Sequence, residues 1–178
     1  MKDATLSQAL KWMFIAQILS IVGAFIPLIG VILIIIAFVL DLVALHAASK
    51  HDNGYHTAFI LSIVGIVVSV VSTFAGDGFF ATLVGIISTL VSLGIIYYVC
   101  TTTSNLLESG GNPAEAARGI TVWKINLICA VASVVLGLLA LIPVIGALAA
   151  VLLVVVAIVE LVGYILYLIF LHKAYHLL

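Results

Sequence analysis

The sequence predicts an all-α transmembrane fold, a six-helix bundle built from three helical hairpins. Of its 178 residues, 66% are hydrophobic and only 7% are charged, a balance that no water-soluble domain of this size tolerates on its surface. The length has room for six spans of about 20 residues. A short run, Phe25–Gly30 (FIPLIG), also recurs as Leu141–Gly146 (LIPVIG) between long apolar segments. We therefore expect residues 1–178 to form a single integral membrane domain.

The first hairpin is expected at about residues 9–48. A continuous helix over this range would be about 60 Å long, twice the thickness of the hydrocarbon core of a bilayer. Pro27 is therefore interpreted as part of a tight turn between spans 9–26 and 28–48. The polar segment 49–56 is expected to be the loop that follows.

The second hairpin is expected at about residues 57–107, with a glycine-containing turn at 76–78. Both of its helices carry small residues at steps of three and four, the pattern that lets two helices approach closely in lipid. We expect helices 57–75 and 79–107 to pack on each other through these faces. The small residues are Ser62, Gly65, Ser69 and Ser72 in the first helix and Thr82, Gly85, Thr89 and Ser92 in the second.

The third hairpin is expected at about residues 121–176, after the longest hydrophilic connection, 108–118. Its second helix, 144–176, would be about 50 Å long, so it should project beyond the bilayer or tilt strongly. The first and third hairpins share a basic-aromatic entry, the Ile-Pro-x-Ile-Gly turn and a late acid, in the same orientation. The pattern predicts a parallel repeat, unlike the inverted repeats of many secondary transporters.

The basic residues predict how the chain lies in the membrane. All six Lys and Arg fall on the side of the two chain termini, so the positive-inside rule places both termini in the cytoplasm, with the protein in the cell (inner or plasma) membrane. The N-terminal segment lacks a convincing cleavage site and is expected to be an uncleaved first span. The formal net charge of −1 provides no basic patch for nucleic acid.

Asp41 and Glu160 are the only carboxylates within the predicted spans. An acid within a span costs about 2.5–3.5 kcal/mol, whereas one interhelical hydrogen bond returns only about 0.6 kcal/mol. Packing alone is a weak reason to carry two acids, so both are candidates for an ion or solute path. The alternative is that both lie near the cytoplasmic interface and bond to hydroxyl groups or water.

Four further polar residues are candidates for the same path. Tyr164 and Tyr167 follow Glu160 along one side of a helix, so a tyrosine hydroxyl is expected to reach the carboxylate, as a structural hydrogen bond or as a proton relay. Gln17 and Asn126 need polar partners inside the bundle. The full set of candidates is Asp41, Glu160, Tyr164, Tyr167, Gln17 and Asn126.

No cofactor, metal site or catalytic motif is predicted. His172 and His176 have the i, i+4 spacing of paired metal ligands, but no HExxH pattern occurs, and the histidines are interpreted as interfacial. No nucleophile with a base and no phosphate-binding loop is found. An enzyme would need a polar cavity that brings His172 or His176 together with an acid. Cys100 and Cys129 are expected to be buried thiols.

The run Ile21–Gly30, followed by an aliphatic helix and a Ser-Lys-His-Asp loop, resembles small prokaryotic multi-pass integral membrane proteins classed as domains of unknown function. The resemblance covers about residues 1–70. It implies a hairpin in the membrane and brings no functional residues with it.

The leading functional hypothesis is a small transporter or channel-type protein for an ion or small solute. The competing hypothesis is a non-catalytic interaction or assembly protein. The small-residue faces and short loops favour a homo-oligomer or a complex with a partner membrane protein in either case. Transport is favoured if Asp41 and Glu160 point into a shared interior with the other polar candidates, and assembly is favoured if they point at headgroups or at an oligomer contact.

Overall fold

The computed structural model describes residues 4–26, 29–74, 76, 79–140 and 142–178, and these contain six helices and no strand. Each helix is long and apolar enough to cross a membrane, by its length and composition. The predicted all-α class, with six helices long and apolar enough to span a membrane, is therefore confirmed. The helices are α1 (Ala4–Phe25), α2 (Ile29–Ala48), α3 (Asn53–Phe74), α4 (Phe79–Ser109), α5 (Pro113–Leu139) and α6 (Pro143–Leu177).

Three helices begin earlier than predicted, α1 at Ala4 rather than at about residue 9, α3 at Asn53 and α5 at Pro113. The Asp52 carboxylate accepts the backbone N–H of Gly54 at 2.7 Å, which caps the first turn of α3. Pro113 opens α5, where its missing N–H costs nothing and its φ suits a helix. Residues 53–56 and 113–118, predicted as loop, are therefore helical.

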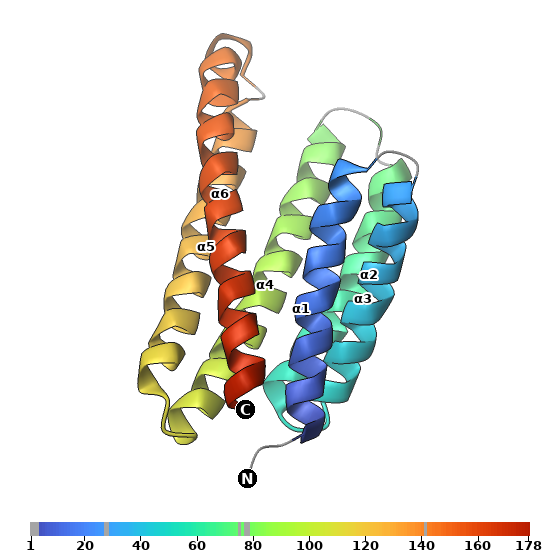
Figure 1. Cartoon of the computed structure of the whole chain (residues 1–178). Helices are drawn as coiled ribbons and strands as arrows, with labels where there is room; N and C mark the ends of the chain where they lie inside the picture. Colours follow the sequence, from blue (N-terminus) through green and yellow to red (C-terminus); the bar gives the residue numbers. More distant parts are fainter. Residues whose placement is uncertain (1–3, 27–28, 75, 77–78, 141) are drawn as a thin grey trace.

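The helices form a closed ring in which each packs against the next in the chain and α6 packs against α1. Consecutive helices run in opposite directions (Figure 1). The first turn of α1 and the last turn of α6 lie at the same end, where the Ser7 hydroxyl donates to the main-chain carbonyl of Tyr175. We call this end of the bundle the terminal end and the opposite end the far end.

The packed core lies toward the terminal end. Its largest fully buried side chains come from the terminal-end halves of five helices and include Tyr55, Phe170, Leu10, Leu45 and Leu107. Toward the far end the α5–α6 pair diverges from α1 and α4, and it extends past the ends of the other helices (Figure 1). With 35 residues, α6 is about 52 Å long, which matches its predicted length.

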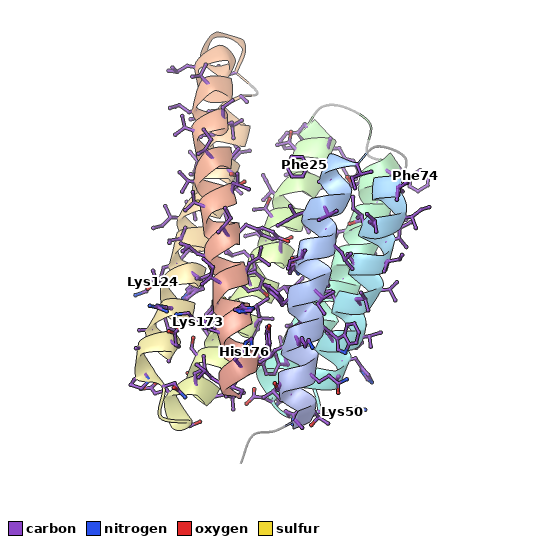
Figure 2. The ribbon with its side chains drawn as sticks, viewed as in Figure 1. Phe25, Lys50, Phe74, Lys124, Lys173 and His176 are labelled. Carbon is purple, nitrogen blue, oxygen red and sulfur yellow. The ribbon has the colours of Figure 1, made fainter. Side chains whose placement is uncertain are left out.

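The outward faces of the helices form an apolar belt. In a bilayer, exposed apolar side chains of this kind are the expected contact surface for the lipid chains. Phe25 and Phe74 lie at the far end, whereas Lys50 and His176 lie toward the terminal end (Figure 2). Members of the belt with more than 50% exposure include Ile32, Val39, Val67, Leu90 and Val154.

The predicted contact between the small-residue faces of α3 and α4 is correct for part of α3. Ser62 is buried, and a Cβ placed on Gly65 would lie 3.5 Å from Val91 of α4. Ser69 and Ser72, nearer the far end, are exposed. The face therefore meets α4 over its first half only.

For α4 the prediction is wrong. A Cβ placed on Gly85 would have no heavy atom within 4 Å, and Thr89 and Ser92 line a cleft toward α5 and α6. The contact with α3 uses another face of α4, since a Cβ on Gly94 would lie 2.9 Å from Cδ1 of Leu61. The helical period identifies a face but not the helix that the face meets.

The glycine of each Ile-Pro-x-Ile-Gly run sits close to the backbone of the preceding helix. A Cβ on Gly30 would collide with the carbonyl oxygen of Gly23, and one on Gly146 would lie 2.9 Å from the carbonyl oxygen of Ala140. Pro27 itself lies outside the described residues, as do parts of the turn predicted at 76–78. Both glycines are thus required by a close approach of backbone to backbone.

Candidate functional site

Asp41 and Gln17 meet between α2 and α1. The Gln17 amide nitrogen Nε2 donates to Oδ1 of Asp41 at 3.4 Å, and both side chains are half-buried. The distance is at the long end for an N–H···O bond. Asp41 is thus held by one weak hydrogen bond and lies on the side of α2 that faces α1.

Tyr164 extends this pair onto α6. Its hydroxyl donates to Oε1 of Gln17 at 2.5 Å and lies 3.3 Å from the main-chain oxygen of the same residue. The Gln17 side chain therefore accepts from Tyr164 with its oxygen and donates to Asp41 with its nitrogen. We call this three-helix arrangement, Tyr164 to Gln17 to Asp41, the polar chain.

Glu160 lies one helical turn before Tyr164 on α6, near the middle of the helix. Its Oε1 accepts the Ser133 hydroxyl of α5 at 2.7 Å. The predicted hydrogen bond from a tyrosine of α6 is wrong at Tyr164, because that hydroxyl is directed to Gln17 on α1. A partner across the helix pair, rather than one turn along the same helix, binds this carboxylate.

The carboxylate of Glu160 lines a cleft of about 490 Å³ between α4, α5 and α6. Tyr164 also lines the cleft, so it contacts both the cleft and the polar chain. The other polar lining residues are Ser88, Thr89, Ser92, Asn126 and Cys129, and the apolar ones include Leu93, Ile96 and Leu161.

Asn126 and Gly163 shape the seam between α5 and α6 at the cleft. The Asn126 amide donates to the carbonyl of Val122 in its own helix at 2.9 Å. A Cβ on Gly163 would lie 3.7 Å from Nδ2 of Asn126 and 3.2 Å from Ile125. Glycine at position 163 therefore lets the two helices approach closely beside the cleft.

The structure brings three of the six predicted residues to the cleft and three to other places. Glu160, Asn126 and Tyr164 line it. Gln17 and Asp41 lie in the polar chain, joined to the cleft through Tyr164. Tyr167 is 6% exposed and belongs to the core at the terminal end, not to the cleft.

The prediction did not identify the α4 lining of the cleft. The spacing of Thr89 and Ser92 indicates that they share one face of a helix, but the prediction assigned this face to the contact with α3. Ser133 was not among the six candidate site residues either. Seven residues separate it from Asn126, so the two share one face of α5, and this spacing was the available signal.

Buried polar contacts also occur at the terminal end. Tyr55 and Thr103 share a hydrogen bond of 2.7 Å between their hydroxyl groups, inside the core. Cys100 is fully buried, and Cys129 is 4% exposed. Both cysteines are buried free thiols, as predicted.

A second cavity, of about 420 Å³, brings His172 and His176 together with Glu115. This is the juxtaposition that the enzyme alternative required. The Glu115 carboxylate is engaged there by two cations, Arg118 at 2.5 Å and Lys173 at 3.0 Å. The described residues contain no group of three or more His, Cys, Asp or Glu side chains that could hold a metal ion. The contacts of Glu115 are those of an ion pair that ties α5 to the end of α6.

The chain matches no family model, and comparisons with curated proteins and with solved structures give no significant match. The resemblance drawn from the first hairpin therefore stays a prediction. A function has to be argued from the residues of the chain itself.

Proposed function

We propose that the protein transports a cation or small cationic solute across the membrane, by way of the Glu160 cleft and the polar chain. The observation that carries the proposal is the position of Tyr164. Its side chain lines the cleft and its hydroxyl bonds to Gln17, which in turn bonds to Asp41. Polar groups from five helices, α1, α2, α4, α5 and α6, are thereby arranged around one tyrosine.

Energetics supports a functional role for the two acids. A carboxylate in the middle of a span costs about 2.5–3.5 kcal/mol on insertion scales. Asp41 has one long hydrogen bond and Glu160 one normal one, and each such bond returns about 0.6 kcal/mol. The two bonds do not offset the cost of two acids, so a structural role alone accounts for them poorly.

The sign of the charge supports a cation. Both acids carry negative charge when ionised, and no Lys or Arg is among the described residues that line the cleft. Acidic side chains are the usual lining of cation pathways in membranes. The closest basic side chains on α5 and α6, Lys124 and Lys173, lie outside this lining.

We further propose that the six helices are arranged as three hairpins, with the first and third related as a parallel repeat. The close backbone contact of Gly30 and of Gly146 at equivalent positions supports the repeat. Lys50 and Lys173 on the terminal-end side support cytoplasmic termini in the cell membrane. The chain carries no catalytic role in this proposal.

A second candidate function is assembly, in which a second copy or a partner membrane protein covers the α4–α6 side. Its specific support is that Glu160 is exposed in the middle of a span and is flanked by exposed Val159 and Leu161. A partner that supplied a polar group there would remove the cost of an exposed acid in lipid.

The test is flux of protons, of potassium ions and of a small organic ammonium ion into proteoliposomes under a gradient. The variants are the unaltered chain, the double variant Asp41→Asn plus Glu160→Gln, and Glu108→Gln as a control at an exposed carboxylate outside the cleft. Flux that the double variant abolishes and the control retains supports transport. Absence of flux under every gradient contradicts it and favours assembly, which crosslinking in the membrane would then examine.

A further inference from the structure

We infer that the cleft beside Glu160 binds a small organic cation in which an ammonium group is attached to an apolar body. This inference rests on the proposed function and names the class of its substrate. The charge, the size and the lining of the cleft, which is polar on one side and apolar on the other, support it.

The cleft offers one anionic group that retains capacity for a ligand. Oε1 of Glu160 accepts the Ser133 hydroxyl, but an ionised carboxylate has about four lone-pair sites on its two oxygens. No Lys or Arg is among the described lining residues to compete for it. A cation is therefore the ligand that this carboxylate favours.

The neutral polar lining provides hydrogen-bond acceptors beside the carboxylate. Thr89 donates its hydroxyl to the carbonyl of Gly85 at 3.0 Å, and Asn126 donates its amide to Val122. Both residues have used a donor within their own helix, which leaves their oxygen lone pairs for a ligand. An ammonium group carries three donors and no acceptor, so it matches this lining.

The size of the cleft favours an organic ligand over a bare monovalent ion. At about 490 Å³ the cleft lies within the range of about 300–1,000 Å³ typical of organic ligands, whereas a single water occupies about 30 Å³. Leu93, Ile96 and Leu161 line its apolar side. Burial of an apolar body against them would contribute about 25 cal/mol per Å².

The test is calorimetric titration of the full chain in detergent with two probes of the same shape, phenethylammonium and the neutral 2-phenylethanol. We expect saturable binding of the amine and affinity at least about tenfold lower for the alcohol. Glu160→Gln should weaken amine binding at least about tenfold, and Glu108→Gln should leave it unchanged. Ala157→Leu, which reduces the cleft without changing its charge, should also weaken it.

Equal binding of the two probes would overturn the inference, as would unchanged amine affinity in folded Glu160→Gln protein. The flux measurement tests transport separately from the substrate class. Glu160-dependent flux of protons or potassium without amine binding would overturn the substrate class and leave transport supported. Glu160-dependent amine binding without flux of the amine, of protons or of potassium would support the site and contradict transport.

Discussion

Gln17 is the residue on which the polar chain depends, because one amide serves two partners. Its oxygen accepts from Tyr164 and its nitrogen donates to Asp41. Glutamine is the side chain that offers both a donor and an acceptor at this length. Neither a glutamate nor an apolar residue could satisfy both partners at once.

Replacement of Gln17 by leucine should lower the free energy of unfolding by about 1 kcal/mol, because Asp41 and the Tyr164 hydroxyl both lose a partner. The measurement is unfolding by SDS titration in mixed micelles. Gln8→Leu is the matched control, since Gln8 is an exposed glutamine of the same helix. A Gln17→Leu protein as stable as the control would contradict the hydrogen-bonded chain.

Gly30 gives a second prediction for a single residue. A Cβ there would collide with the carbonyl oxygen of Gly23, so Gly30→Ala should destabilise the protein by about 1–3 kcal/mol through overpacking. Gly85→Ala is the control, because nothing lies within 4 Å of its Cβ position. Thermal unfolding in detergent compares them, and equal melting temperatures would be inconsistent with the close contact.

Among the contacts between helices, the hydrogen bond between Tyr55 and Thr103 links the start of α3 to the end of α4. A double-mutant cycle with Tyr55→Phe and Thr103→Val should give a coupling of about 0.5–1.5 kcal/mol. Both changes keep the shape of the side chain. Strictly additive effects on unfolding would show that the two hydroxyl groups do not stabilise each other.

The presence of the six helices could be predicted from the sequence, whereas the residues at which they begin and the helices that they contact could not. Apolar runs of about 20 residues identify spans because lipid leaves the backbone little alternative to a helix. The start of α5 was not predicted, because the polarity of Ala114–Arg118 is typical of a loop. Its alanine, glutamate and arginine residues are nevertheless good helix formers. The neighbour of the α4 face was wrong because periodicity carries no information on tertiary contacts.

The sequence was sufficient to predict which residues belong to the candidate site, but not which of them form hydrogen bonds with each other. The cost of acids in lipid singles out Asp41 and Glu160. The partner of Glu160, however, is Ser133, 27 positions away on the neighbouring helix, and the hydroxyl of Tyr164 reaches across to α1. Such pairings depend on how the helices rotate against each other, which local sequence does not determine.

Over the whole molecule, a packed terminal end and a diverging far end give the bundle two unlike halves (Figure 1). The polar chain lies between them. This division accounts for a cleft that is open on the α4–α6 side while the core around Tyr55 and Phe170 is closed. In the proposed transport cycle, access from the terminal end would require that core to loosen.

Orientation in the membrane gives a prediction for the whole molecule. Tags at both chain ends should be protected from protease in intact cells and be cleaved in inverted membrane vesicles, because the basic residues favour a cytoplasmic position for the terminal end. A tag at either end that is cleaved in intact cells would contradict this topology.

The most direct test of the transport path is the flux carried by Tyr164→Phe. The change removes one hydroxyl group and leaves Asp41, Gln17 and Glu160 in place, so it separates the cleft from the polar chain. Tyr97→Phe, at an exposed tyrosine packed on Trp123, is the control. We expect cation flux in proteoliposomes to fall at least about tenfold in Tyr164→Phe, equivalent to about 1.4 kcal/mol, and to be unchanged in Tyr97→Phe. Flux in Tyr164→Phe equal to that of the unaltered chain would contradict a path that runs through this residue.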